Sequence, residues 1–212
     1  MLTIVIATHN NHKVVELLRS MESLPITWVT LKDLQIDTII EEAGTSIDEN
    51  ATLKAQEYAR LTGMYTLSDD SGLTVDALNG RPGVHSSRYG EPNMSSKQQR
   101  TLLLNELHDI SWNKRQAQFR CTLVLAHPYS TDLNIASGIC QGLITTSDRG
   151  TGGFGYDPIF YMPDQSCTMA EMSSLTKNRV GHRGKATLRM KIKIANLISR
   201  NKISGANASS TK

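Results

Sequence analysis

Hydrophobic residues near the start of the chain form a dense run, followed by a run with helical spacing. Residues 2–7 (LTIVIA) are almost all apolar and rich in β-branched side chains, which is typical of a strand buried on both faces. The polar segment THNNHK at residues 8–13 comes next, and apolar residues then recur at Val14, Leu17 and Met21. This order predicts a strand, a polar turn and a helix.

Further along the chain, other segments again predict a helix and a strand. Ser46 and Glu49 have the spacing of a capping box and predict the start of a second helix. The segment MYTLS at residues 64–68 predicts a short strand that leads directly to two aspartates. A turn at the glycine after Ser71 is expected to follow.

The second half of the chain predicts three more strands and a long helix. Residues 117–127 (AQFRCTLVLAH) alternate apolar and polar positions, as a half-buried strand does. Residues 133–140 and 142–146 continue as strands, and a glycine-rich loop occupies residues 149–160. From Gly184 the apolar positions follow an amphipathic helix. Strands mixed with helices predict an α/β protein.

Composition narrows the class of protein. The 212 residues and the hydrophobic fraction of 39% suffice for one domain, expected over residues 1–203, with a disordered tail over residues 204–212. The net charge of +3 is too small to imply a stable nucleic-acid or membrane partner. The three cysteines form no zinc or disulfide pattern, which favours a reducing cytoplasm. The first apolar run is too short for a signal peptide or a membrane span.

Charge is distributed unevenly along the sequence. Acidic residues crowd the first half, and none follows Glu171, where only lysines and arginines carry charge. This favours a cation on the acidic side and an anionic substrate against the basic side. A solvated basic helix face is the simpler account of most of the late lysines.

Asp69 and Asp70 stand side by side although adjacent carboxylates repel each other. Successive side chains of a strand point to opposite faces, so one aspartate is expected to face the site and the other to point away. The second could accept hydrogen bonds from backbone N–H groups of the glycine turn. The first is a candidate magnesium ligand, because Mg²⁺ needs only one or two carboxylates together with water and substrate phosphates.

Further charged residues precede the two aspartates. Glu41, Glu42 and Glu49 are candidate partners of the same cation, and Lys54 lies nearby in sequence. Glu49 has an alternative role as the third residue of the capping box. Lys54 could also be a solvated lysine, as most are.

Three other segments could bind a nucleotide. The helix start at residues 8–13 could hold phosphate through backbone N–H groups and Lys13, although an ordinary cap with an exposed lysine fits as well. In GTGGFGYDP the glycines permit close approach of the backbone, and Phe154 could stack on a base. In GHRG, Arg183 could donate from a cleft to oxygen acceptors.

Taken in this order, the segments resemble the inosine triphosphate pyrophosphatase family over residue 3 to about residue 197. The markers are THNNHK, EEAGTSIDENATLKA, SDDSGLTVDALNGRPGVHSSRYG, GTGGFGYDPIF and GHRGKA. The resemblance implies an elongated α/β fold with a long mixed sheet flanked by helices, and two lobes with a nucleotide cleft between them. It also implies a homodimer and Mg²⁺-dependent hydrolysis of ITP, dITP or XTP to the monophosphate and pyrophosphate.

The resemblance further implies the roles of individual residues. Asp70 and Lys54 would be catalytic, with Asp70 near the metal and Glu42 or Glu41 as a further ligand. Phosphate would be held by Ser71 and by Thr8, His9, Asn10, Asn11, His12 and Lys13. The base pocket would be lined by Phe154, Gly155, Tyr156, Asp157, Lys177, His182 and Arg183.

Two positions depart from the family pattern. Gly181 stands where a serine usually precedes His-Arg, and Ile47 stands where an aromatic is common. Two alternatives remain open: a Mg²⁺-dependent pyrophosphatase for other modified nucleotides, and a non-catalytic protein that binds nucleotides or nucleic acid. The second leaves the acidic residues without a role.

Overall fold

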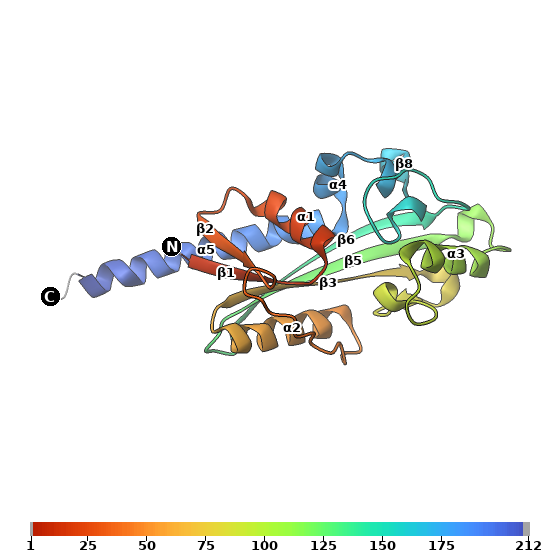
Figure 1. Ribbon diagram of the computed structural model, residues 1–212. Helices are drawn as coiled ribbons and strands as arrows, with labels where there is room; N and C mark the ends of the chain where they lie inside the picture. The colour runs from red at the N-terminus through yellow and green to blue at the C-terminus, as the bar shows by residue number, and fades with distance from the viewer. Residues whose placement is uncertain (1, 210–212) are drawn as a thin grey trace.

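A single mixed sheet forms the centre of the protein in the computed structural model, which describes residues 2–209 and their side chains to residue 200 (Figure 1). Its strands are β1 (Leu2–Ala7), β2 (Ile26–Thr30), β3 (Tyr65–Val75), β4 (Pro82–Gly83), β5 (Gln116–Ala126), β6 (Leu133–Ile144), β7 (Phe160–Met162) and β8 (Cys167–Thr168). The α-helices are α1 (Asn11–Met21), α2 (Ile47–Thr62), α3 (Ser96–Glu106), α4 (Ser174–Val180) and α5 (His182–Ser209).

The strands follow the order β2-β1-β3-β5-β6-β7-β8, and β4 pairs with β3. Strand β1 runs parallel to both of its neighbours, whereas the pairs from β3 onward are antiparallel. Helices α1 and α5 cover one face of the sheet and α2 covers the other (Figure 1). The expected α/β fold with a mixed sheet flanked by helices is therefore confirmed. The two lobes with a cleft between them stay a prediction.

Strand β3 is much longer than the short strand that the sequence predicted. It runs through both aspartates and Gly72 to Val75 without the expected turn. Gly72 is needed for pairing rather than for turning, because a Cβ there would overlap the backbone of Gly83 in β4. The prediction of a glycine turn after Ser71 was wrong for this reason.

Strand β6 and helix α5 are also longer than predicted. The two expected strands at residues 133–140 and 142–146 form one continuous strand. Gly138 in this strand lets α5 pack closely, since a Cβ there would meet the backbone of His182 and Ala186. Helix α5 begins at His182, two residues before the predicted start.

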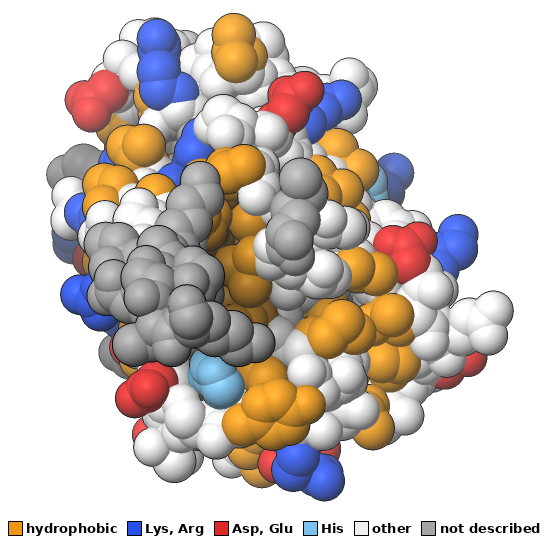
Figure 2. Space-filling view, turned by 90° about the vertical axis from the view of Figure 1, so that its left-hand side faces the viewer, with side chains coloured by type: hydrophobic (Ala, Val, Ile, Leu, Met, Phe, Trp, Pro, Cys, Tyr) orange, Lys and Arg blue, Asp and Glu red, His pale blue; other side chains and the backbone are white. Residues whose placement is uncertain are grey.

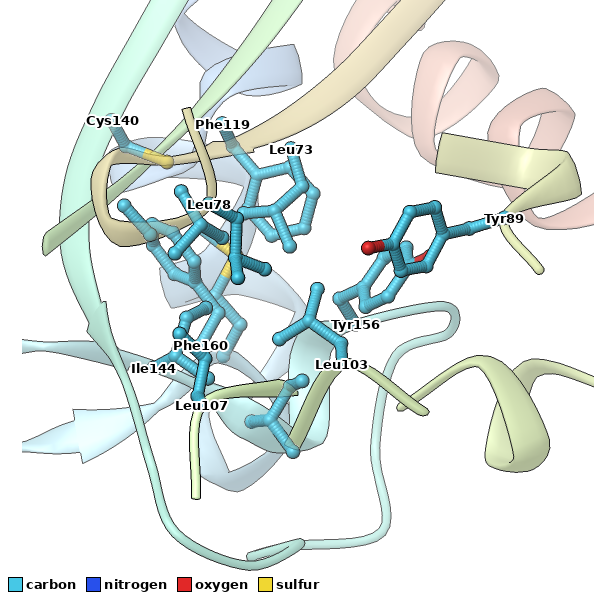
Figure 3. Close-up of a cluster of buried hydrophobic side chains, with 14 of the residues drawn as sticks. Leu73, Leu78, Tyr89, Leu103, Leu107, Phe119, Cys140, Ile144, Tyr156 and Phe160 are labelled. Carbon is cyan, nitrogen blue, oxygen red and sulfur yellow. The ribbon is translucent and has the colours of Figure 1, made fainter. Parts of the chain in front are cut away.

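The apolar core consists of two main clusters along the long strands. One packs β1, β3 and β5 against α1 and α5, with Leu17, Leu67, Leu123 and Met190 among its members. The other lies toward the opposite end of β3 and β5. Its buried side chains include Leu73, Leu103, Phe119, Tyr156 and Phe160 (Figure 3).

The C-terminal part of the chain is helical as far as Ser209. The expected disordered tail over residues 204–212 stays a prediction, and residues 210–212 lie outside the described residues. No helix among the described residues has both the length and the hydropathy to cross a lipid bilayer. On the end of the molecule shown in Figure 2, Lys and Arg side chains are scattered among acidic, apolar and uncharged ones. The described side chains on this face therefore form no continuous basic surface.

Candidate active site

The candidate active site lies where β1 stops beside β3. Strand β1 pairs with β3 only as far as Ala7 opposite Ser68, while β3 continues to Val75. Strand β4 joins this edge at Leu73 and Thr74. In the described part of the chain, the intervening stretch of β3 at residues 69–72 has no strand on this side. Ligands in α/β proteins commonly bind at such crevices beyond the carboxyl end of a parallel strand.

Asp69 and Asp70 point to opposite sides of β3, as the alternation of a strand requires. Asp69 Oδ1 lies 2.7 Å from Lys13 Nζ of α1, and its Oδ2 accepts from Arg183 Nε of α5 at 2.7 Å. Asp70 Oδ1 instead lies 2.8 Å from Lys54 Nζ of α2. The backbone N–H groups expected to bind Asp69 are not its partners, because the glycine turn that would have supplied them is absent and two cations take their place.

The two carboxyl groups have different protonation behaviour. Burial raises the pKa of Asp69, but the charges of Arg183 and Lys13 outweigh it and hold the pKa below its ordinary value. Burial also raises the pKa of Asp70, and there the nearby Lys54 and Lys13 only partly offset it. Asp69 is therefore a fixed anion, whereas Asp70 takes up a proton more readily than an exposed aspartate.

Lys54 joins Asp70 to a second carboxylate. Its ammonium lies 2.7 Å from Glu42 Oε1, and Glu42 Oε2 accepts from Arg88 at 2.9 Å. Burial lowers the pKa of Lys54, but Asp70 and Glu42 more than offset this and raise it. Glu41 is exposed on the surface. The sequence left Glu41 and Glu42 as alternatives, and the structure brings Glu42 to the site.

The residues around Asp70 fit a magnesium ion. Among the described residues no group of three or more His, Cys, Asp and Glu side chains could hold a metal. Asp70 and Glu42 nevertheless converge on one ammonium, so a cation already occupies the space between them. Mg²⁺ is commonly held by one or two carboxylates plus substrate phosphates, and this donor pair meets that need. Glu49 lies in the first turn of α2, where its carboxylate accepts from Thr45.

The segment of residues 8–13 faces two different hollows. Asn10, His12 and Lys13 line the cavity that contains Asp70, whereas Thr8, His9 and Asn11 line a neighbouring hollow beside Thr30 and Lys32. Asn10 Oδ1 accepts from the backbone N–H groups of His12 and Lys13. Two of the helix's N-terminal donors are thus already capped, and the Lys13 side chain is the main cation that this segment offers to the cavity.

The glycine-rich loop forms the other wall of the cavity, whose volume is about 290 Å³. Phe154, Gly155, Tyr156 and Asp157 line it together with Ser71, His182 and Arg183. The ring of Phe154 stacks on His12 with centroids 5.1 Å apart, and Lys177 Nζ lies 4.7 Å from the centre of the same ring. An aromatic ring therefore lies beside the cavity that holds the carboxylates.

Arg183 is buried rather than exposed in a cleft, which corrects the expectation from the sequence. Only 4% of the residue is exposed, and its guanidinium donates to Asp69, Glu16 and Ser71. Burial would lower its pKa, but the charge of Asp69 raises the pKa well above the usual range. The carboxylates of Asp69 on β3 and Glu16 on α1 offset the cost of burying this arginine.

Lys177 and His182, which were expected to line the base pocket together with Arg183, are buried as well. Lys177 Nζ lies 2.7 Å from Glu16 and 2.6 Å from Asp157. His182 stacks on Phe119 with centroids 4.6 Å apart, and burial, followed by the charge of Arg183, lowers its pKa well below the ordinary value. His182 is therefore a neutral ring in the wall of the cavity.

Glu16 is the main residue that the sequence analysis missed. Its two oxygens lie 2.7 Å from Lys177 and from Arg183, so α1 is tied to both α4 and α5. Burial raises the pKa of Glu16, but Arg183 and Lys177 together bring it below the ordinary value. The available signal was its position three residues after Lys13, which places both on one side of the helix.

Ion pairs link the two ends of the site without a break. From Asp157, which also accepts from the backbone of Phe154, the pairs run through Lys177, Glu16 and Arg183 to Asp69. Asp69 is joined to Asp70 by the peptide bond between them in β3. The loop beside the aromatic ring and the carboxylates are consequently held in one rigid framework.

Comparison with known proteins agrees with this geometry. Residues 4–193 match the model of the Ham1 family. A dITP/XTP pyrophosphatase of Geobacter sulfurreducens is 43% identical over 90% of this chain and 96% of its own length. The structure of a HAM1 protein from Coxiella burnetii has a TM-score of 0.85 and 36% identity, covering 92% of this chain and all of that one. A nucleoside-triphosphatase, or dITP/XTP pyrophosphatase, from Mycobacterium abscessus has a TM-score of 0.73, with 36% identity over 89% of this chain and 98% of its own.

The fold and these relatives therefore place the chain among the hydrolases of nucleoside triphosphates. Within that class, the chain belongs to the Ham1 family. The resemblance drawn from the sequence motifs is confirmed.

Proposed function

We propose that the protein hydrolyses non-standard purine nucleoside triphosphates, namely ITP, dITP and XTP, to the monophosphate and pyrophosphate with Mg²⁺. The observation that carries this proposal is the pairing of Asp70 and Glu42 around Lys54 in a cavity whose opposite wall holds Phe154. A carboxylate pair with a lysine suits a metal-bound triphosphate, and an aromatic ring beside glycines suits a base.

The phosphate chain would lie along the open edge of β3. Lys13 and Lys54 approach this edge from α1 and α2, and their ammonium groups lie 3.5 Å and 3.1 Å from the carbonyl oxygen of Asp69. Each would exchange a carboxylate or carbonyl contact for a phosphate oxygen when the nucleotide binds. Charge neutralisation of this kind is the main requirement of phosphoryl transfer.

Asp70 would hold the attacking water and take its proton. A carboxylate positioned beside the phosphates can act as a general base of this kind. Bound Mg²⁺, held by Asp70 and Glu42, would supply charge stabilisation to the phosphates and to the pyrophosphate leaving group. Lys54 contacts the same two carboxylates and so orients them before any ligand is present.

The base would lie against Phe154, with N–H donors directed at its 6-oxo group. Four hydrogen bonds occupy four of the five N–H groups of Arg183, which leaves one on Nη1 within the described residues. Adenine has an amino group at the same position. This group is itself a donor, so it could not accept a hydrogen bond from Arg183. A site built to bond a specific group can discriminate by roughly 10⁴-fold.

The test is product analysis with a panel of nucleoside triphosphates. We expect pyrophosphate release from ITP, dITP and XTP at rates far above those from ATP. Phosphorus NMR or chromatography would measure the products. Equal turnover of ATP and ITP, or orthophosphate as the first product, would refute the proposal. Preferred turnover of modified pyrimidine nucleotides would instead support the alternative pyrophosphatase, and no turnover of any triphosphate would support a binding protein.

We further propose that the enzyme acts as a homodimer in the cytoplasm, as the family resemblance and the cysteine pattern imply. The sequence of the chain supports the location through its three free cysteines, two of which are buried. Light scattering after gel filtration tests the dimer, and a monomeric mass at micromolar concentration would contradict it.

A further inference from the structure

The first half of the glycine-rich loop is anchored by its own second half and by the segment that follows the loop in the chain. The backbone N–H of Arg149 donates to the carbonyl oxygen of Pro158, and the N–H of Gly152 donates to the carbonyl oxygen of Ala170 at 2.9 Å. Thr168 donates from its hydroxyl to the carbonyl of Arg149. These bonds hold the first half of the loop.

Arg100 of α3 holds the loop from the other side. Its Nε and Nη2 donate to the carboxylate of Asp148 at distances between 2.6 Å and 3.1 Å, and its Nη1 donates to the carbonyl of Gly155 at 2.8 Å. Asp148 precedes the glycines and Gly155 follows most of them. One guanidinium therefore spans the part of the loop that contains the glycines, from Asp148 to Gly155.

Packing does little to fix Gly155, which makes this hydrogen bond important. A Cβ at Gly155 would have no neighbour within 4 Å, and φ of this residue is +58°, a conformation that glycine adopts freely. By contrast, a Cβ at Gly150 would collide with the backbone around Ala170. The loop is thus packed near Gly150, whereas Gly155 itself is held by the bond from Arg100 to its carbonyl, next to Phe154, whose backbone N–H donates to Asp157.

The peptide after Gly155 leads directly into the wall of the cavity. Because a peptide unit is planar, fixing the direction of the Gly155 carbonyl also fixes the N–H of Tyr156. Phe154, on the other side of Gly155, carries the ring proposed to stack on the base. Helix α3 is itself well placed, since Leu103 packs beside Tyr156 in the apolar cluster (Figure 3).

We propose that Arg100 is a positioning residue for base recognition, which holds Phe154 and the Gly155–Tyr156 peptide in the geometry that a purine needs. Asp148 orients the guanidinium, whose planar fork lets one group bond a carboxylate twice and a carbonyl once. A lysine could reach one of these acceptors but could not hold both in a fixed plane. This inference rests on the proposed function, because it assigns the base to the cavity that Phe154 lines.

The first test measures the loop itself and does not depend on activity. Hydrogen exchange of the nucleotide-free protein would be followed by mass spectrometry for peptides that cover residues 148–156. We expect faster exchange in Arg100→Ala and Arg100→Lys than in the unaltered protein. Arg60→Ala is the control, because it removes an arginine ion pair, with Glu57 on α2, that does not contact the loop. Exchange in this loop that is unchanged in Arg100→Ala would overturn the proposal.

The second test separates positioning from simple stability. For Arg100→Ala we expect KM for ITP to rise about tenfold, as for loss of one charge-assisted hydrogen bond, with kcat within about twofold. The preference for ITP over ATP should fall, and Arg100→Lys should restore little of it. A parallel loss of kcat and thermal midpoint with an unchanged ITP preference would show a merely structural role. If the unaltered enzyme fails to prefer ITP, the proposed function fails, whereas the exchange result still decides whether Arg100 holds the loop.

Discussion

Asp69 and Asp70 are consecutive residues of β3 that form ion pairs with lysines on opposite sides of the sheet. Asp69 Oδ1 lies 2.7 Å from Lys13 Nζ, and Asp70 Oδ1 lies 2.8 Å from Lys54 Nζ. The lysines come from α1 and α2, which cover different faces. Both reach the same stretch of β3 because β1 ends beside Ser68. Each carboxylate thus has its own cation, and the repulsion between neighbours is offset.

The first prediction compares the two aspartates. Asp70→Asn keeps the shape of the side chain but removes the charge that would take a proton from water. We expect kcat for ITP to fall by about 10²–10⁴-fold, with a small change in thermal midpoint. Asp69→Asn should retain kcat within about tenfold but lower the thermal midpoint, because Arg183 and Lys13 lose their counter-charge. Steady-state kinetics at saturating Mg²⁺ and thermal melts check both.

A severe loss of turnover in folded Asp69→Asn would contradict this division of roles. It would show that both carboxylates serve the reacting centre, although their side chains point to opposite faces.

The second prediction concerns the dependence of stability on pH. The pKa of Asp69 is held below its ordinary value of about 3.9, so the folded state binds this proton less tightly than the unfolded state. The stabilisation is therefore complete above about pH 4 and is lost as the pH falls toward the lowered pKa. We expect the difference in thermal midpoint between the unaltered protein and Asp69→Asn to be constant from pH 7 to pH 5 and to shrink below pH 4. A difference that grows in acid would contradict the ion pair.

The third prediction concerns Arg183. Removing one partner of a buried ion pair leaves an uncompensated charge, which typically costs about 3–5 kcal/mol. Arg183→Ala should lower the free energy of unfolding by this order, measured in urea, because Asp69 and Glu16 lose a shared partner. Arg183→Met combined with Asp69→Asn should cost less than the sum of the single changes.

This prediction would be contradicted if Arg183→Ala unfolded at the same urea concentration as the unaltered protein. It would show that the contacts of Arg183 with Asp69 and Glu16 contribute little to stability.

The fourth prediction concerns Lys54 and the metal. Because Lys54 lies between Asp70 and Glu42, it competes with Mg²⁺ for the same carboxylates in the absence of nucleotide. Lys54→Met should bind Mg²⁺ more tightly in nucleotide-free protein, by roughly tenfold or more, since a unit charge has been removed next to the cation. The same variant should lose turnover, because the phosphates lose a cation. Calorimetric titration without nucleotide measures the affinity, with Arg60→Ala as the control. Unchanged or weaker Mg²⁺ binding would contradict the prediction.

Much of the fold could be predicted from local patterns. The first strand, the helix that follows the polar segment at residues 8–13 and the cap of α2 at Ser46 follow from period and capping residues, and the structure confirms them. The length of β3 could not be predicted, because a glycine within an extended run reads as a turn. Gly72 is needed for the close approach of Gly83, a residue that only the folded chain brings there.

Several predicted site residues come together in the structure, but the connections between them were not predicted. Asp70, Lys54 and Phe154 lie around one cavity or bond to its walls, in agreement with the motifs. Glu16 was missed, because its partners Lys177 and Arg183 are more than 160 residues away in the chain. Thr8, His9 and Asn11 belong to the predicted phosphate segment, yet they face a neighbouring hollow, since the chain turns there from strand to helix.

The order of strands and helices, the family, and the opposite directions of Asp69 and Asp70 can be predicted from the amino-acid sequence, because they depend on spacing within short segments. Which charges form pairs depends on the folded arrangement of distant segments. Arg183 and Lys177 belong to the basic last part of the chain, and their burial depends on Glu16, Asp69 and Asp157 arriving from three other parts of the chain. A buried charge is tolerated only when its partner is in place, and no local pattern specifies a partner on a distant element.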